Sequence, residues 1–289
     1  MIKENAYAKI NLFLDVCSKR DDGFHDVKTV MQSISLSDEL TLSAEYSEKS
    51  EIIIRTQGAE LASDRTNLVY RAVEEYLLRS GISATVDITL IKNIPISAGL
   101  GGGSSDAAAA LRAMNRRFNK LSDIELLALA AEIGSDVPFC IDGETALCLG
   151  RGEMITKIPY SKRPYLVVAI GNERVSTPQA YAALDSRFDS FKSGTETGGS
   201  VYFDILLSAL KNNRDIPSEL FNVFEQVLPK NENSVQKIKA EMKKQGATTA
   251  LMSGSGPSVF GIFEAPEAAF SARDVLANLG YTAFCASFS

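Results

Sequence analysis

The sequence predicts an α+β protein of two domains, and three observations support this fold class. The 289 residues are enough for one large or two medium domains. Strand-like and helix-like segments follow one another without the strict alternation of a doubly wound sheet. After the polar segment 161–164, the apolar strand pattern starts again with "YLVVAI" at 165–170. We therefore expect an N-terminal domain at 1–160 and a C-terminal domain at 161–289.

The first expected strand carries two polar residues of interest. In "YAKINLFLDV" (7–16), apolar residues alternate with Lys9, Asn11 and Asp15, a pattern typical of a strand that is buried on one face. Lys9 and Asn11 should therefore point in the same direction, on the open face. For Asn11 this leaves two interpretations, a functional residue or a solvent-facing polar residue.

Periodicity and cap signals predict the remaining elements. Apolar residues at helical spacing indicate N-terminal helices at 66–81, from 104 onward and at 122–134, the last with a capping-box spacing at Ser122 and Glu125. The same criteria predict C-terminal helices near 201–212, 219–226, 232–245 and 267–279. Apolar segments predict further strands at 51–56, 86–91, 250–254, 257–263 and 282–288. The polar, glycine-rich stretch 185–200 is typical of a surface loop.

Composition and charge exclude several classes of function. The net charge is −6, and basic residues gather only in the scattered stretch 237–244, so we expect no nucleic acid partner. No segment resembles a signal peptide or a membrane span, so we expect a cytoplasmic protein without a membrane partner. The four cysteines lack paired spacing and should be free, mostly buried thiols. The single histidine, His25, excludes a multi-histidine zinc site.

A glycine-rich segment, "ISAGLGGGSSDAAAALRAM" (96–114), leads directly into one of the expected helices. The first-turn amides of a helix lack intrahelical partners, and the helix dipole adds positive potential there. Glycines let the backbone approach closely and adopt positive φ, so several N–H groups can turn toward one phosphate chain. The hydroxyls of Ser104 and Ser105 would add donors or a Mg²⁺ ligand. A flexible glycine turn capped by serine is the alternative.

Two common phosphate-binding fingerprints do not fit this segment. A dinucleotide-binding G-x-G-x-x-G that starts at Gly99 would need a third glycine at position 104. A Walker loop would need a lysine after its last glycine, and that position is also Ser104. If the segment binds phosphate, it is a cradle of another kind.

A carboxylate stands in the otherwise apolar segment "IGSDVPFCI" (133–141). Asp136 must find a partner among these neighbours, and Lys9 is a candidate. The residues alone leave two interpretations open: a catalytic acid–base group with its lysine, or a structural ion pair or Asp turn at a helix end.

Three motifs, in order along the chain, resemble those of the GHMP kinases, a family named for galactokinase and for homoserine, mevalonate and phosphomevalonate kinases. They are "AYAKINLFL" (6–14), "PISAGLGGGSSDAA" (95–108) and "LMSGSGPSVFG" (251–261), and they span nearly the whole chain. The extra glycine in the second motif, "DDGFH" (21–25) and "GSDVPF" (134–139) narrow the resemblance to one member. That member acts on a cytidine diphosphate-linked methylerythritol, in the non-mevalonate synthesis of isoprenoid precursors.

This resemblance implies a two-domain GHMP kinase fold with the active site in the cleft between the N- and C-terminal domains. It implies ATP and Mg²⁺ as cofactors and direct phosphorylation of a tertiary hydroxyl, with Asp136 as base and Lys9 stabilising charge near the γ-phosphate. Metal ligands stay unassigned. The residues implied for nucleotide binding are Asn67, Pro95, Ile96, Ser97, Ala98, Gly99, Leu100, Gly101, Gly102, Gly103, Ser104 and Ser105. Of these, Asn67 would contact the adenine edge, and a helix N-terminal cap is an equal alternative for it.

The resemblance also implies how a small-molecule substrate is held. Asn11 would position the substrate, and His25 would hydrogen-bond the cytosine edge. Phe24, where the family commonly has Tyr, would stack on the base. Tyr181, where the family often has Phe, would form the opposite wall; a core residue on a helix face is its alternative. For the assembly we expect a monomer or a weak homodimer.

Two other functions stay open at this stage. Another GHMP kinase, of the homoserine or mevalonate type, would lack the cytosine-binding stretch 21–25. A non-catalytic ligand sensor on the same scaffold would need neither Lys9 nor Asp136. The presence of all these features favours the kinase of a cytidyl substrate.

Overall fold

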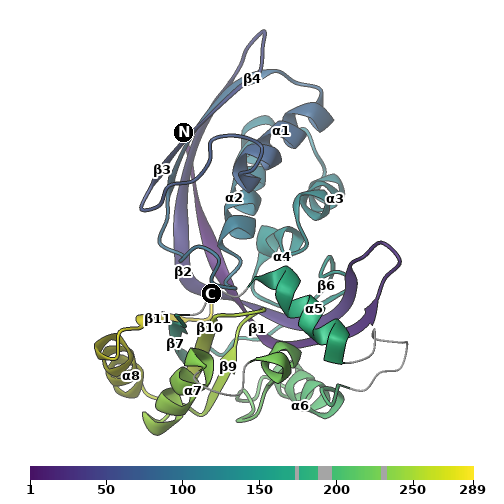
Figure 1. Ribbon diagram of the computed structural model, residues 1–289. Helices are drawn as coiled ribbons and strands as arrows, with labels where there is room; N and C mark the ends of the chain where they lie inside the picture. The colour runs from purple at the N-terminus through teal and green to yellow at the C-terminus, as the bar shows by residue number, and fades with distance from the viewer. Residues whose placement is uncertain (173–175, 188–196, 229–232) are drawn as a thin grey trace. The chain divides into compact units, whose positions relative to one another are not determined.

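A computed structural model describes residues 1–172, 176–187, 197–228 and 233–289, and these mix helices with two sheets, as the α+β class predicts (Figure 1). The chain forms two compact units, neither of which is continuous in sequence. Unit 1 comprises Met1–Lys9, Leu36–Ser97 and Gly101–Gly143, and unit 2 comprises Ile10–Ser35, Ala98–Leu100 and Glu144–Ser289. The division at residue 160, which follows the sequence instead, stays a prediction.

Two long strands contribute residues to both units. β1 (Ile2–Lys19) extends the expected strand at both ends. β2 (His25–Tyr46) was not predicted from the sequence. The expectation that β1 has an open face is wrong, because every residue from 8 to 14 is buried. Its polar face is covered too, and there the polar side chains are buried with polar partners.

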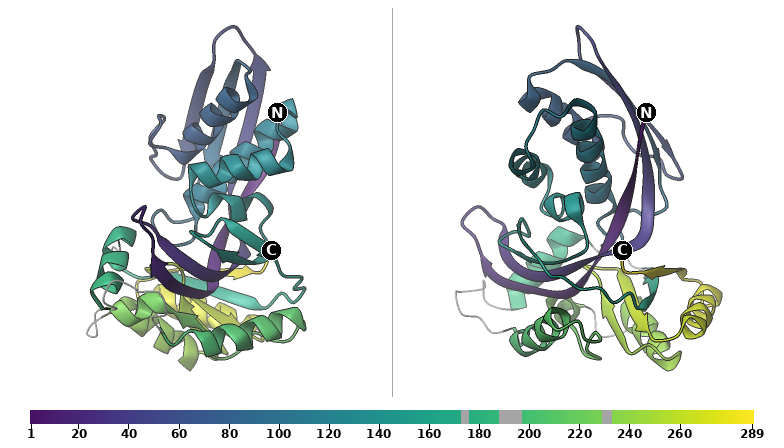
Figure 2. Two further views of the ribbon diagram at one scale, coloured as in Figure 1. Left: turned by 90° about the vertical axis from the view of Figure 1, so that its right-hand side faces the viewer. Right: turned by 180° about the vertical axis from the view of Figure 1, so that it is seen from behind.

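In unit 1, helices pack beside a sheet (Figures 1 and 2). The unit 1 part of β2 pairs antiparallel with β4 (Ala84–Ile91), which pairs in parallel with β3 (Glu51–Gln57). Alternate residues of β4 are buried, so one face of the sheet meets the core. The helices are α1 (Leu68–Ser80), α2 (Gly102–Phe118), α3 (Asp123–Ile133) and α4 (Val137–Asp142). The predicted capping box at the start of α3 is present.

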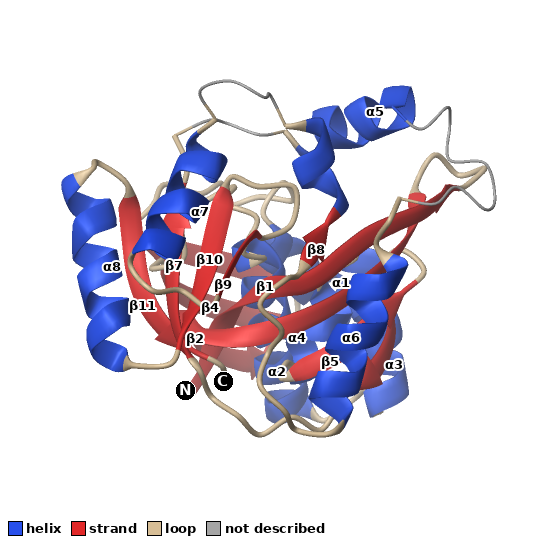
Figure 3. Cartoon of the chain, turned by 90° about the horizontal axis from the view of Figure 1, so that it is seen from below, coloured by secondary structure: helices blue, strands red, loops and turns tan. Residues whose placement is uncertain are grey.

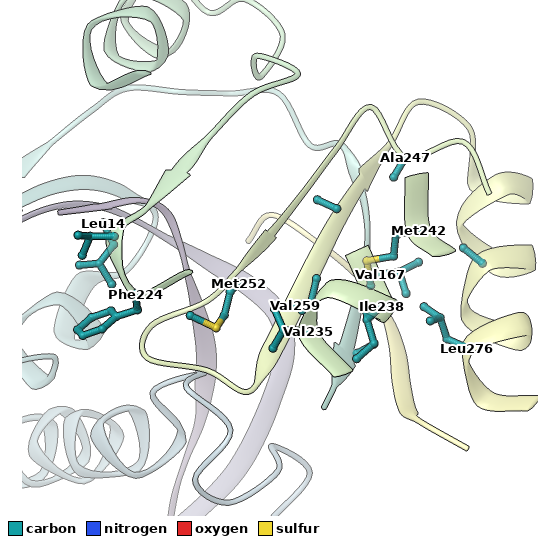
Figure 4. Close-up of a cluster of buried hydrophobic side chains, with 14 of the residues drawn as sticks. Leu14, Val167, Phe224, Val235, Ile238, Met242, Ala247, Met252, Val259 and Leu276 are labelled. Atoms are coloured by element: carbon teal, nitrogen blue, oxygen red, sulfur yellow. The ribbon is translucent and has the colours of Figure 1, made fainter. Parts of the chain in front are cut away.

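In unit 2, a four-stranded sheet of order β11-β7-β10-β9 confirms the predicted C-terminal strands (Figure 3). Its strands are β7 (Tyr165–Ile170), β9 (Thr249–Met252), β10 (Ser258–Phe263) and β11 (Thr282–Ser287). α7 (Ser234–Lys244) and α8 (Pro266–Asn278) pack against this sheet. Figure 4 shows the buried apolar cluster that holds them there, with Val167, Met242 and Leu276 among its members.

The other elements of unit 2 correct parts of the sequence prediction. They are β5 (Thr145–Leu149), β6 (Met154–Lys157), α5 (Thr177–Arg187), α6 (Ser200–Lys211), β8 (Phe221–Asn222) and the 3₁₀ helix η1 (Val223–Val227). The predicted helix near 219–226 is therefore wrong: this stretch contains β8 and most of η1, because the Asn222 side chain accepts from the Phe224 N–H and caps a tighter turn. The predicted loop 185–200 overlaps α5 and the first residue of α6, and its residues 188–196 lie outside the described part of the chain.

The cysteines and the helix lengths bear on two further expectations. None of the four cysteines, all of which the structure describes, forms a disulfide, as predicted; Cys140 and Cys148 are buried, Cys285 is partly buried and Cys17 is exposed. Burial raises the pKa of the Cys140 thiol to about 12, which keeps it unreactive. Over the described ranges, no helix combines the length and the apolar composition that crossing a bilayer requires.

Candidate active site

The glycine-rich segment ends in the N-terminus of α2. The helix begins at Gly102, two residues earlier than expected, and Gly101 caps it in the left-handed region, with φ 71°. No side chain hydrogen-bonds this N-terminus as a cap. The amides of the first turn have no intrahelical partners, and here no side chain caps them either. This arrangement favours an anion.

The glycines in this segment serve different purposes. A Cβ at Gly101 would lie 2.8 Å from the Cγ of Lys9, so the Lys9 stem leaves no room for a side chain there. A Cβ at Gly99, whose φ is 79°, would lie 2.7 Å from the carbonyl oxygen of Ser253. At Gly103, by contrast, the nearest atom to such a Cβ is Leu68 Cδ1 at 3.5 Å. Packing requires the first two glycines but not Gly103.

The two serines of the segment differ in their environment. The Ser105 hydroxyl is buried and donates to the carbonyl of Gly101 at 2.7 Å. It therefore closes the turn of its own helix. Ser104 is only partly buried, which makes it the more accessible of the two hydroxyls expected to meet phosphate or Mg²⁺.

The residues before α2 are held largely by backbone contacts. Ala98 and Leu100 are buried, and the Ala98 carbonyl accepts the Ser258 N–H at 3.2 Å. Ile96, in contrast, is 55% exposed. Of these three residues, Ile96 therefore has the side chain that a nucleotide can contact most readily, since those of Ala98 and Leu100 are covered.

Lys9 and Asp136 form the ion pair that the sequence suggested. Lys9 Nζ lies 3.3 Å from Asp136 Oδ2. The lysine side chain is almost fully buried, whereas 31% of the aspartate side chain is exposed. Asp136 occupies the N-cap position of α4 without making a cap hydrogen bond. The pair therefore presents an accessible carboxylate with a buried ammonium behind it, beside the backbone of Gly101.

A second group of charges, Asp38, Lys92 and Asp106, lies wholly inside unit 1. Lys92 Nζ contacts Asp38 and lies 2.5 Å from Asp106 Oδ2, and all three side chains are at least 95% buried. Asp38 also accepts the Ile94 N–H at 2.8 Å. Burial raises the pKa of Asp106 to about 7; Lys92 opposes this shift and Asp38 adds to it. The group ties together β2, the residue that follows β4, and the part of the glycine-rich segment that lies in α2.

Asn67, expected at the adenine or at a helix cap, has the cap. Its side-chain oxygen accepts the Val69 N–H at 2.9 Å, and its amide donates to the Ala62 carbonyl at 2.8 Å. The cap interpretation is confirmed, and the adenine contact stays a prediction.

Asn11 is buried in unit 2 and not solvent-facing. Its side-chain oxygen accepts the Gly254 N–H at 3.0 Å, and its amide donates to the Thr29 hydroxyl at 2.8 Å. Gly254 lies in the third motif, in the turn that connects β9 with β10. Asn11 therefore ties the first of the three motifs to the third.

The residues expected at the cytosine also lie in unit 2. The His25 and Tyr181 rings stack with centroids 4.7 Å apart. His25 is buried, and its Nε2 lies 2.7 Å from Asp185 Oδ1. Phe24 is 52% exposed, with the Arg151 guanidinium 5.1 Å from its ring centre. Tyr181 packs against the core of this unit and lies edge-on to Phe224, so it has the expected core contacts as well.

Family models match both halves of the chain. The model described as "GHMP kinases N terminal domain" matches residues 67–144, which include Asp136 and the start of α2. The model described as "GHMP kinases C terminal" matches residues 206–282, which include the β9–β10 hairpin. The chain belongs to the GHMP kinase family. These matches confirm the resemblance found in the three motifs. Kinases of this family use ATP as the phosphoryl donor.

Individual GHMP kinases resemble the chain over nearly its whole length. The "4-diphosphocytidyl-2-C-methyl-D-erythritol kinase" of Caldicellulosiruptor saccharolyticus is 42% identical, over 94% of this chain and 91% of the relative. A crystal structure of 4-(cytidine 5'-diphospho)-2C-methyl-D-erythritol kinase is 32% identical, with a TM-score of 0.81 and coverage of 100% and 99%. The homoserine kinase of Cytophaga hutchinsonii is 22% identical, with a TM-score of 0.71 and coverage of 100% and 94%. This last likeness shows the GHMP kinase fold alone.

Sequence reasoning missed several polar residues of this GHMP kinase that hydrogen-bond or pair with the predicted site residues or with the glycine-rich segment. They are Thr29, Asp38, Lys92 and Asp185. Only Asp185 had a usable signal, because it follows Tyr181 by four residues in a helical stretch and so lies on the same face. The others belong to no motif, and only the folded chain brings them beside Asn11 or the glycine-rich segment.

Proposed function

We propose that the chain phosphorylates the tertiary 2-hydroxyl of 4-diphosphocytidyl-2-C-methyl-D-erythritol with ATP, a step in the non-mevalonate synthesis of isoprenoid precursors. The relatives that match most of the chain at 32–42% identity carry the name of this activity. The observation that carries the proposal is the ion pair of Lys9 with the accessible carboxylate of Asp136. A kinase of an alcohol needs such a group, and a ligand sensor does not.

The pair suits the proton transfer that this reaction requires. Asp136 accepts the proton of the substrate hydroxyl as the hydroxyl oxygen attacks the γ-phosphorus. Lys9 pairs with the carboxylate and, beside the N-terminus of α2, stabilises the negative charge on the transferred group. As the new P–O bond forms, the bond between the γ-phosphorus and the β–γ bridging oxygen breaks and ADP leaves, so the phosphoryl group passes directly to the substrate without an intermediate on the protein.

The backbone around Gly103 offers the phosphate cradle. The first-turn amides of α2 provide donors, and the space beside Gly103 lets a phosphate approach the backbone. Asn67 remains a candidate for the adenine edge, although both groups of its side chain already have partners.

Mg²⁺ fits this site as a companion of the nucleotide. Among the described residues, no three His, Cys, Asp or Glu side chains group together as a metal site. The ion would therefore be held chiefly by the phosphates, with the Ser104 hydroxyl as a protein ligand, since the Ser105 hydroxyl is engaged within α2. Mg²⁺ would neutralise charge on the β- and γ-phosphates.

Recognition of the cytosine falls to the residues around His25. Phe24 has an exposed ring that can stack on a base, and His25 can hydrogen-bond a base edge. In the described structure Tyr181 covers the face of His25, so its part as the opposite wall of the base stays a proposal. A homoserine or mevalonate kinase would have no use for this aromatic group.

Product analysis tests the proposed reaction. With ATP and the cytidyl substrate, ³¹P NMR should show ADP together with a new phosphomonoester signal, while the diphosphate signals of the substrate persist. Hydrolysis of ATP to inorganic phosphate without the monoester would contradict the proposal, as would transfer to the cytidine ribose.

A further inference from the structure

The structure holds the one histidine of the chain through a carboxylate on α5. His25 Nε2 lies 2.7 Å from Asp185 Oδ1, and 94% of the histidine side chain is buried. The second oxygen of Asp185 lies 2.5 Å from Lys19 Nζ. All three residues belong to unit 2, in which α5 (Figure 1) supplies the carboxylate.

The charge on Asp185 fixes what the histidine nitrogen must do. Burial pushes the pKa of Asp185 up, but hydrogen bonds from Lys19 and His25 outweigh it, and the pKa lies below its usual value. An ionised carboxylate only accepts hydrogen bonds, so the proton in this contact sits on His25 Nε2. A ring that carries a single proton therefore has it on Nε2 and has its lone pair on Nδ1.

The same helix also fixes the ring plane. Tyr181 lies one turn before Asp185 and stacks on the imidazole with an interplanar angle of 26°. Tyr181 is in turn held edge-on by Phe224, with ring centres 5.0 Å apart. One turn of α5 thus sets both the edge and the face of His25.

We propose that Asp185 is a positioning residue that determines base specificity. It holds His25 as the Nε2–H tautomer, so that Nδ1 accepts a hydrogen bond from the exocyclic amino group of a cytosine. This inference rests on the proposed function. Cytosine presents an amino donor where uracil presents a carbonyl acceptor, and an acceptor nitrogen favours the first and repels the second. Asp185 itself does not contact the base.

Because the chain has a single histidine, ¹⁵N NMR of labelled protein tests the tautomer without a substrate. At pH 8 the wild-type protein should show one protonated ring nitrogen, Nε2, and one unprotonated nitrogen, Nδ1. Asp185→Asn, whose amide can accept or donate, should show a mixture of tautomers. A wild-type ring protonated at Nδ1, or at both nitrogens, overturns the proposal.

Kinetics provide the second test. Asp185→Asn should raise KM for the cytidyl substrate about tenfold, the scale of one hydrogen bond, and lower the preference for the cytidyl over the uridyl analogue by a similar factor. Turnover at saturation and KM for ATP should stay within about twofold. The control, Asp274→Asn, removes an exposed partner of Arg273 on α8 and should change none of these values.

The two tests separate this inference from the proposed function. A wild-type enzyme that does not turn over the cytidyl substrate contradicts the function, whatever the NMR shows. An active wild type whose Asp185→Asn variant keeps the cytidyl preference contradicts the positioning role alone.

Discussion

At the scale of single residues, the chemistry depends on Asp136. Asp136→Asn keeps the shape but cannot accept a proton, so kcat should fall on the order of a hundredfold or more while KM for ATP stays nearly constant. Coupled ADP release measures both values. Asp123→Asn, an exposed aspartate at the start of α3, is the matched control and should behave as wild type. Unchanged turnover in Asp136→Asn would leave the ion pair with a structural role only.

Phe24 allows a clean test of base stacking, because its ring is 52% exposed and contributes little to the core. Phe24→Ala should raise KM for the cytidyl substrate by an amount that corresponds to about 1–3 kcal/mol, the scale of one base–aromatic stack. Steady-state kinetics should show KM for ATP barely changed, and Phe24→Tyr should be nearly silent. If the alanine variant instead raised KM for ATP and left KM for the cytidyl substrate unchanged, residues 21–25 would bind the nucleotide and not the substrate.

Sequence reasoning reached residues whose chemistry conflicts with their surroundings. Asp136 in an apolar segment needed a cation, and the structure provides Lys9. It could not reach Asp38 or Lys92, because nothing in their neighbourhoods along the chain distinguishes them from surface charges. Their burial results from long-range packing of three elements, which local sequence does not encode.

At the scale of elements, the N-terminus of α2 separates glycines that the fold needs from one that a ligand needs. Gly103→Ala meets no close neighbour and replaces glycine by a better helix former. Its melting temperature should therefore equal or exceed that of the wild type, while KM for ATP rises about tenfold or more if phosphate contacts this backbone. Unaltered ATP kinetics would return the loop to a purely structural role.

Gly101→Ala is the contrasting variant. Its φ of 71° and a Cβ position 2.8 Å from Lys9 Cγ should cost about 1–3 kcal/mol of stability. Thermal unfolding should show this loss with no nucleotide present. A fully stable Gly101→Ala would mean that the Lys9 stem can move aside.

The buried group of Asp38, Lys92 and Asp106 predicts a pH-dependent stability. Since the pKa of Asp106 is raised from 3.8 to about 7, the folded chain keeps a proton that the unfolded chain has lost. The free energy of unfolding that depends on this proton is therefore greatest below about pH 4. It declines as the pH rises to about 7 and levels off above that.

Asp106→Asn removes this titration and, above about pH 7, one buried negative charge. Relative to wild type, the variant should gain on the order of 2 kcal/mol more stability at pH 8 than at pH 5. Urea unfolding at the two pH values measures the difference. An equal loss of stability at both values would show that Asp106 is ionised throughout and strongly paired with Lys92.

Elements with local signals were predicted well, and those that depend on partners were not. The caps at Asn67 and Ser122 mark the starts of α1 and α3 in the sequence as in the structure. β2 escaped prediction because serines and charged residues interrupt its alternation, and its 22 residues are held by several neighbouring strands. β8, with two residues, has no periodicity to detect.

At the scale of the whole molecule, the fold class and the family followed from the sequence, while the division into units did not. Because β1 and β2 each supply residues to both units, chain order and spatial order differ. A composition change near residue 161 cannot reveal that. The expectations of a cleft active site and of a monomer or weak homodimer stay predictions.

Substrate choice is the central claim, and one assay tests it most directly. ATP-dependent ADP release should be measured with the wild-type chain and three alcohols at equal concentration: the cytidyl methylerythritol substrate, homoserine and mevalonate. We expect saturable turnover with the first and only the background ATPase rate with the other two. Turnover with homoserine or mevalonate, or none with the cytidyl substrate, would contradict the account.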